Sequence, residues 1–223
     1  MNLDRVILID KPAGLTSFGV VARVRRQLTE QLRLKKGKEH QRVKVGHTGT
    51  LDPFATGLLI LLSGKMTKKS AEFLKLDKVY EATIELGATS TTGDPEGEIT
   101  QCEAKMVTLE AVQEVLKNFV GEIEQTPPIY SAIKVDGQRA YRLARQGKPV
   151  EMPTRQVTIH NIELLDFNFP ELKIRVHCSS GTYIRTLAED IGKALGTEAY
   201  TKELRRLKVG TYDVADADKT FVI

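Results

Sequence analysis

The chain has 223 residues, of which 41% are hydrophobic and 28% are charged, a balance that favours a soluble globular domain over a disordered chain. The longest apolar run, Leu58 to Leu62, is too short to cross a bilayer, and the N-terminus lacks the pattern of a signal peptide. The two cysteines, Cys102 and Cys178, have no Cys or His nearby at ligand spacing. This disfavours a structural zinc site and points to a reducing, cytoplasmic compartment.

Positive charge is concentrated in one segment. Between Arg23 and Lys44, nine Lys or Arg oppose two Glu, a local charge of +7 that leaves −3 for the rest of a chain whose net charge is +4. Such an excess can bind a polyanion such as nucleic acid. It is equally typical of a solvated helix face followed by a loop, and charge alone leaves both interpretations open.

The first elements are a strand over Val6 to Ile9 and, after a loop with Pro12 and Gly14, a helix that Ser17 can cap. We expect this helix to fade near Leu32 and to be followed by a basic loop or insertion at about 32–44. Its apolar face is predicted to contain Phe18, Val21, Val24 and Leu28.

The middle of the chain predicts a buried strand over 58–62, a short helix over 67–74 and a half-exposed strand over 79–86. A turn follows at "TTGDPEGE". Thr108 caps an amphipathic helix that ends at Gly121, and a hairpin turn at Asp136-Gly137 precedes a short basic helix.

The last third predicts strands over 157–165 and 172–178, a helix from a Thr182 cap to Leu195, and a strand over 204–214. Strands outnumber helices, and neither sustained βαβ alternation nor a phosphate-binding glycine loop is present. We therefore predict an α+β fold, one domain over 1–223 with a mixed, mainly antiparallel sheet.

Asp52 lies in "VGHTGTLDPFATGLLILL", residues 45–62. An Asp followed by Pro is a common helix start, so Asp52 could be a simple N-cap. However, a helix here must end by Gly57, and a cap contributes little to a helix of about one turn. The alternative is a carboxylate held in place to react, beside two glycines that allow a ligand to approach the backbone closely.

His47 precedes Asp52 by five residues. A lone His is more often structural than catalytic, and no metal set, nucleophile triad or zinc-deaminase signature accompanies it. We therefore expect any site here to work without a metal.

The segment "CSSGTYIRTLAEDIG" (178–192) places Tyr183 and Arg185 at a helix start. Arg185 could pair with Glu189 on a surface helix, or Tyr183 could stack on a base while Arg185 binds a carboxylate or phosphate. Tyr80 could be a second stacking platform or an ordinary strand aromatic.

Five blocks in the same order resemble the TruB family of tRNA pseudouridine synthases, and together they span nearly the whole chain. They are "DKPAGLTSFGVV" (10–21), "VGHTGTLDPFATGLL" (45–59), "PPIYSAIKVDGQRAYRLARQG" (127–147), "SSGTYIRTLAEDIG" (179–192) and "ELRRLKVGTY" (203–212). The resemblance implies the pseudouridine-synthase fold, with helices and loops around an RNA cleft. It also implies an isomerase that needs no cofactor and acts on position 55 in the T-loop of tRNA.

The resemblance also implies roles for individual residues. Asp52 would be the nucleophile, with Arg185 paired to it and His47 beside the flipped nucleotides. The remaining residues would line the base pocket or support the cleft: Tyr80, Tyr183, Leu204, Lys11, Pro12 and Lys68. The expected partner is the T-arm of tRNA, bound by a monomer that uses neither membrane nor metal.

Two departures from the family matter. Bacterial members commonly carry a PUA-type RNA-binding domain after the catalytic one, and this sequence is expected to lack it. The basic stretch over 32–44 is longer than usual, and we hypothesise that Lys35, Lys36, Lys38 and Arg42 supply part of the missing phosphate contact. Two alternatives remain: an RNA-binding tRNA folding helper with dispensable catalysis, and the same chemistry on another RNA.

Overall fold

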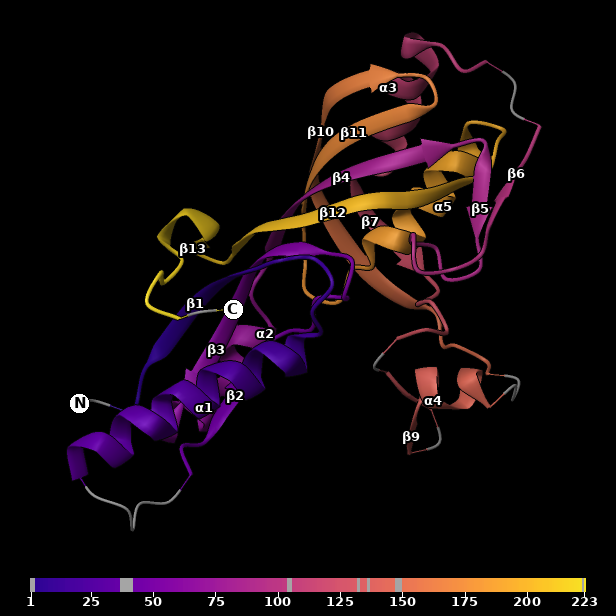
Figure 1. Ribbon diagram of the computed structural model, residues 1–223. Coiled ribbons are helices and arrows are strands. Elements are labelled where there is room, and N and C mark those ends of the chain that lie inside the picture. Colours follow the sequence, from indigo (N-terminus) through magenta and orange to yellow (C-terminus); the bar gives the residue numbers. More distant parts are fainter. Residues whose placement is uncertain are drawn as a thin grey trace. The chain divides into compact units, whose positions relative to one another are not determined.

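The computed structural model describes residues 3–36, 42–103, 106–131, 133–135, 137–146, 150–221 and 223 (Figure 1). The chain divides into two compact units. The first unit consists of Met1–Tyr80 and Leu204–Ile223, and the second unit consists of Glu81–Glu203. Strands β4 (Lys78–Leu86) and β12 (Ala199–Val209) each begin in one unit and end in the other.

The main sheet has the strand order β1-β3-β12-β4-β11-β10-β7, with β2 added to β3 and β13 added to β12. The β3–β12 pair is parallel, whereas β1–β3, β2–β3, β10–β11 and β7–β10 are antiparallel. This arrangement confirms the predicted mixed, mainly antiparallel α+β fold. The other strands of the sheet are β1 (Val6–Lys11), β2 (Val45–His47), β3 (Thr56–Ser63), β7 (Gly121–Gln125), β10 (Arg155–Asn168), β11 (Glu171–Cys178) and β13 (Tyr212–Asp213).

Two hairpins form small sheets of their own. Strand β5 (Ala88–Ser90) pairs with β6 (Ile99–Gln101), and β8 (Lys134–Val135) pairs with β9 (Gln138–Arg139) at the predicted turn, of which Asp136 lies outside the described residues. The helices are α1 (Ser17–Lys36), η1 (Gly64–Lys69), α2 (Ser70–Leu74), α3 (Leu109–Asn118), α4 (Ala140–Arg145), α5 (Ile184–Ala194) and η2 (Val214–Asp216).

Strand β3 is the centre of the first unit's core. Residues 57–63 of this strand are all buried, as its unbroken apolar sequence predicts. Leu58, Ile60 and Leu62 pack in one cluster with Phe73 of α2 and Val209 of β12. The strand is therefore a rigid support for the loop that precedes it.

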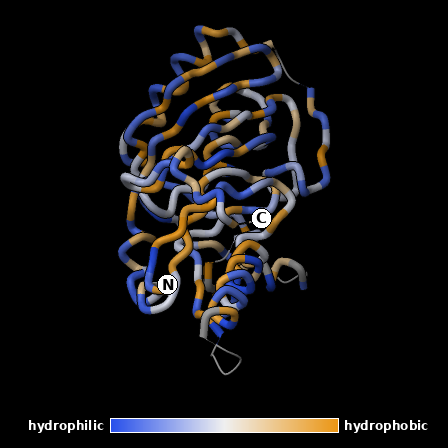
Figure 2. The backbone as a smooth tube through the Cα atoms, turned by 60° about the vertical axis from the view of Figure 1, so that its left-hand side comes forward, coloured by the Kyte–Doolittle hydropathy of each residue, from blue (hydrophilic) through white to orange (hydrophobic). Residues whose placement is uncertain are grey.

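Helix α1 differs from the prediction in three ways. It continues to Lys36 instead of fading near Leu32, and its N-cap is Thr16, whose Oγ1 accepts a hydrogen bond from the Gly19 N–H at 3.0 Å. Val21, Val24 and Leu28 are buried, but Phe18 is 68% exposed. The tube of this helix carries both hydrophobic and hydrophilic residues along its length (Figure 2).

Helix starts in the second unit follow the sequence only in part. Thr108 caps α3 as predicted, because its side chain accepts a hydrogen bond from the Ala111 N–H. Thr182 does not cap α5: its hydroxyl donates to the Ser179 carbonyl, and Tyr183 occupies the cap position without a side-chain bond. The final predicted strand is two strands, β12 and β13, which pair across a turn.

Candidate active site

Asp52 does not start a helix. The backbone N–H of Ala55 donates to the Asp52 carbonyl at 3.2 Å, and residues 52–55 form a turn that leads directly into β3. Pro53 suits the second position of such a turn because its φ is already restricted. The N-cap interpretation is therefore wrong. The side chain of Asp52 is half-buried at the surface of the first unit.

The loop after β1 holds the Asp52 turn from one side. The Lys11 ammonium is fully buried, and it donates to the carbonyls of Pro12 at 2.9 Å, Leu15 at 2.8 Å and Pro53 at 3.1 Å. The Gly14 N–H also donates to the Pro53 carbonyl, at 2.8 Å. A buried charge is tolerated only when such partners surround it, so Lys11 organises both loops, while Pro12 stays exposed.

Ser17 holds the residue just before Asp52. Its buried hydroxyl donates to the Leu51 carbonyl and accepts from the Leu51 N–H, both at 2.8 Å. We call this pair of bonds the Ser17 clamp. Since Thr16 caps α1, the Ser17 hydroxyl is available for this contact.

Arg206 supports the same region from β12. Its guanidinium is buried and donates to the carbonyls of Leu58 at 2.7 Å, Gly49 at 3.2 Å and Thr50 at 3.4 Å. A side chain at Gly57, where φ is +99°, would collide with the Arg206 backbone. The sequence analysis did not identify Arg206. The available signal was an arginine at a strand position that points into the core, because a buried arginine needs hydrogen-bond partners.

His47 ends β2 and is half-buried. Its Nδ1 accepts a hydrogen bond from the Gly49 N–H at 3.4 Å. Burial, and secondarily the positive charge of Arg206, lower the pKa of His47 below its ordinary value. The imidazole is therefore neutral at neutral pH and presents an uncharged flat ring.

Three other predicted residues also lie in the first unit. Tyr80 of β4 and Leu204 of β12 are each 9% exposed, which suits residues that line an apolar pocket. Lys68 of η1 is exposed.

Tyr183 belongs to the second unit, where the Gln125 side chain fixes its backbone. The Tyr183 N–H donates to Gln125 Oε1 at 3.0 Å, and Gln125 Nε2 donates back to the Tyr183 carbonyl at 3.2 Å. The Arg155 guanidinium lies over the Tyr183 ring, 4.8 Å from its centroid. One face of this ring is thus held by a cation–π contact.

Arg185 forms a buried ion pair with Asp94. Its Nη1 donates to Asp94 Oδ2 and to the Thr92 carbonyl, both at 2.9 Å, and its Nη2 donates to the Tyr130 carbonyl at 3.0 Å. The sequence predicted only a turn at Asp94, and its role as a partner of Arg185 was missed. Asp52 lies in the first unit and Arg185 in the second, so their pairing stays a prediction.

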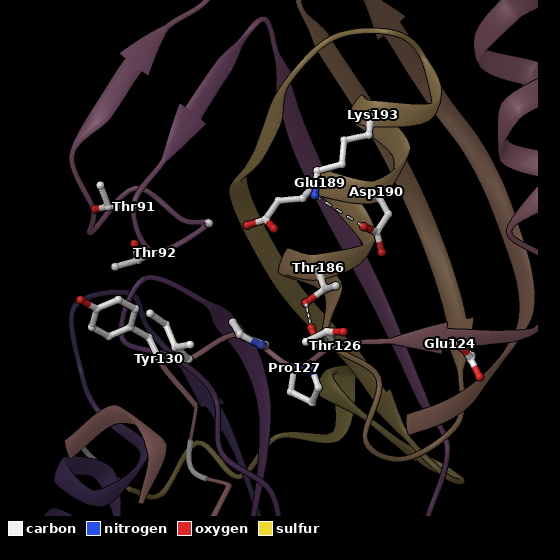
Figure 3. Close-up of a pocket in the computed structure, with 13 residues that line it drawn as sticks. Thr91, Thr92, Glu124, Thr126, Pro127, Tyr130, Thr186, Glu189, Asp190 and Lys193 are labelled. Atoms are coloured by element: carbon white, nitrogen blue, oxygen red, sulfur yellow. Dashed lines mark hydrogen bonds and ion pairs between the residues drawn. The ribbon is translucent and has the colours of Figure 1, made fainter. Parts of the chain in front are cut away.

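The second unit contains a hollow of about 450 Å³ (Figure 3), whose lining includes Thr92 and Tyr130, the residues whose carbonyls accept hydrogen bonds from Arg185. It is lined by residues 91–93, Glu124, residues 126–130 and four side chains of α5, and by none of the predicted site residues. Burial raises the pKa of both Glu189 and Asp190, against the effect of nearby Lys193. Three carboxylates, those of Glu124, Glu189 and Asp190, make this hollow unsuited to the phosphates of a nucleic acid.

The first unit contains a basic hollow of about 610 Å³. Arg42 and Lys44 line it just before β2, and Lys65 and Lys68 line it from η1. The one carboxylate of its lining is Asp4, whose Oδ1 accepts from the Lys65 N–H at 2.6 Å. All four basic side chains are exposed, and none forms an ion pair with another described residue. Of the other predicted phosphate contacts, Lys35 and Lys36 end α1, and Lys38 lies outside the described residues.

Among the described residues, no helix is long and apolar enough to span a membrane. Two family models match the chain in succession. The model of the TruB family pseudouridylate synthase N-terminal domain covers residues 35–184, and that of the tRNA pseudouridylate synthase B C-terminal domain covers residues 185–221.

Curated relatives cover most of the chain. The tRNA pseudouridine synthase B of Phocaeicola vulgatus is 49% identical over 95% of this chain and 88% of its own length. The protein of the same name from an Azoarcus species is 48% identical over 96% of this chain and 68% of its own length.

Solved structures share the fold. A chain of a Cbf5-Nop10-Gar1 complex superposes with a TM-score of 0.69 at 31% identity, over 93% of this chain and 49% of that chain. A chain of an H/ACA ribonucleoprotein bound to a substrate RNA gives a TM-score of 0.61 at 27% identity, over 97% of this chain and 50% of that one. This chain thus spans about half the length of these structural relatives. The family models, the relatives and the fold agree: the chain belongs to the TruB family of pseudouridylate synthases.

Proposed function

We propose that this protein converts uridine to pseudouridine at position 55 in the T-loop of tRNA, with Asp52 as the reacting carboxylate. The observation that carries the proposal is the support of the Asp52 turn. Lys11 and Gly14 bind one side of it, Ser17 binds the other, and Arg206 binds the residues before it. Such preorganisation is what a catalytic carboxylate requires. The relatives named tRNA pseudouridine synthase B support tRNA as the substrate.

The reaction is an isomerisation, so its atoms balance without a second substrate. The bond from N1 of uracil to C1′ of the ribose breaks, the base turns, and a bond from C5 to C1′ forms. C5 loses a proton and N1 gains one. The ionised Asp52 carboxylate can begin by attacking C1′, which releases the base with the N1–C1′ electron pair, or by removing the C2′ proton to form a glycal-like intermediate.

The target base must leave its stack before Asp52 can reach the ribose, and unstacking costs a few kcal/mol. We infer that His47, Tyr80 and Tyr183 compensate by contacting flipped bases, and that Leu204 closes the base pocket against water. The neutral ring of His47 suits this role because it can stack without a charge to solvate. Arg185, held by Asp94, is inferred to orient the Asp52 carboxylate.

The remaining predicted residues act on the RNA backbone or on the loops. We infer that Lys68 and the other cations of the basic hollow bind phosphates, because four exposed basic side chains line it together with one carboxylate, that of Asp4. Lys11 and Pro12 shape the loop that supports the Asp52 turn.

The test is to incubate the purified chain with unmodified tRNA and map pseudouridine. Asp52→Asn should abolish the product and leave tRNA affinity within about threefold of the wild type, because the amide keeps the shape but removes the nucleophile. Asp216→Asn, at an exposed aspartate of η2, is the matched control and should retain full activity.

Each alternative has its own outcome in this assay. A wild-type chain that binds tRNA but makes no pseudouridine would support an RNA folding helper instead. Product found mainly outside the T-loop would support the same chemistry on another RNA site.

A further inference from the structure

Phe18 is an aromatic residue that the fold leaves on the surface. It is 68% exposed, whereas its neighbour Ser17 is 3% exposed. Successive residues of a helix point about 100° apart, so a helix that turns Ser17 toward Leu51 must turn Phe18 away from the core. The Ser17 clamp therefore determines the exposure of Phe18.

Phe18 is also close to Asp52. Consecutive Cα atoms are 3.8 Å apart. The path from the Phe18 Cα to the peptide that joins Leu51 to Asp52 has three parts: the step to the Ser17 Cα, the Ser17 side chain and its hydrogen bond to the Leu51 carbonyl. Together they place the Phe18 Cα within about 10 Å of that peptide. Phe18 therefore lies in the first turn of α1, next to the residue that the Ser17 clamp ties to the Asp52 turn, and in the same unit as Asp52.

The surroundings of Phe18 are open and basic. Gly14, on the neighbouring loop, has no atom within 4 Å of the position a side chain would take, and it is exposed. Ala22 and Arg25 follow Phe18 at i+4 and i+7, on the same strip of α1. None of the described residues forms an ion pair with Arg25. An exposed ring, a small residue and a cation in a row suit a stacked base and its phosphate.

We propose that Phe18 stacks on an unpaired base of the RNA substrate, a base next to the target uridine and not the uridine itself. The inference rests on the proposed function, because it takes the substrate to be RNA. Single-stranded loops offer splayed bases to aromatic side chains in this way. A stack of this kind changes affinity about 5- to 150-fold when the ring is removed.

The first experiment compares Phe18→Ala, Phe18→Leu and Phe18→Tyr. Tyrosine should keep wild-type affinity for tRNA, whereas alanine and leucine should weaken it about 5-fold or more because they lack a π-face. Leu34→Ala is the matched control, since Leu34 lies on the same helix and is 88% exposed. Equal affinities of the leucine and tyrosine variants would overturn the proposal.

The second experiment detects the stack directly. The chain contains no tryptophan, so Phe18→Trp creates a single indole probe. Its fluorescence should be quenched when tRNA binds, and thermal unfolding should stay at the wild-type temperature because the position is exposed. An unquenched indole in a variant that still binds tRNA would overturn stacking.

The two proposals fail in different ways. If the wild type forms pseudouridine, but Phe18→Ala has no effect on affinity and the indole is not quenched, the stacking proposal is refuted and the proposed isomerase activity still holds. Quenching with no product from the wild type supports the stack and refutes the proposed isomerase.

Discussion

His47 is the residue near Asp52 whose charge state follows most directly from its surroundings. Its pKa is lowered from 6.5, first by burial and then by Arg206. A group with a depressed pKa in the folded state contributes stability above its unfolded pKa, and this stability is lost as the pH falls through the folded pKa. We therefore expect the His47 imidazole to titrate below pH 6.5 in an NMR experiment.

The same residue gives a stability test. The His47→Asn variant should lack the part of the acid destabilisation below about pH 6.5 that His47 causes. The difference in melting temperature between variant and wild type should therefore change with pH below that value and be constant above it. A midpoint for His47 above 6.5 would contradict the lowered pKa.

At the scale of elements, the start of α1 separates two hydroxyl groups that look interchangeable in sequence. Thr16 caps the helix, and Ser17 clamps Leu51. Ser17→Ala should leave the buried N–H and carbonyl of Leu51 without their partner, at a cost of about 1–3 kcal/mol. It should also lower the single-turnover rate of pseudouridine formation, since the Asp52 turn loses a support.

Thr16→Ala is the control for this prediction. It should destabilise the fold by about 1 kcal/mol through the lost cap and keep the rate per folded molecule. Equal rate losses in both variants, measured at saturating enzyme, would mean that the Ser17 clamp has no separate part in the reaction.

Charge is the property of the whole molecule that bears on function. The net charge is +4, and the basic hollow gathers Arg42, Lys44, Lys65 and Lys68 near the end of β3 that is remote from the Asp52 turn. Eight strand residues span about 25 Å, so these cations are suited to hold a distant phosphate and not the reacting uridine.

Replacing Arg42, Lys44 and Lys65 together by alanine should weaken tRNA binding on the order of 10- to 100-fold at 0.1 M salt. It should also reduce the slope of log K against log salt by about 2 to 3, since each phosphate contact contributes about 0.9. The single-turnover rate with saturating enzyme should stay unchanged. Lys173→Ala, at an exposed lysine of β11, should alter neither quantity. An unchanged slope in the triple variant would show that the hollow does not bind phosphate.

The sequence by itself determined most elements, the mixed sheet and the identity of the candidate carboxylate. Hydrophobic periodicity and turn residues depend only on neighbouring positions in the chain, so they predicted β3, α3 and the hairpin near Gly137. The order of the motifs pointed to the family. The motif around Asp52 could be recognised in the same way, because its residues are contiguous in the sequence.

Only the tertiary structure decided which side chains meet. Arg206 and Leu58 are 148 positions apart, Arg185 and Asp94 are 91 apart, and Ser17 and Leu51 are 34 apart, so no periodic pattern relates them. The contact between Ser17 and Leu51 sets the rotation of α1, and that rotation makes Ser17 buried and Phe18 exposed. Its apolar character alone predicted that Phe18 would be buried. That prediction was wrong because the burial of a side chain also depends on what packs against its face of the helix.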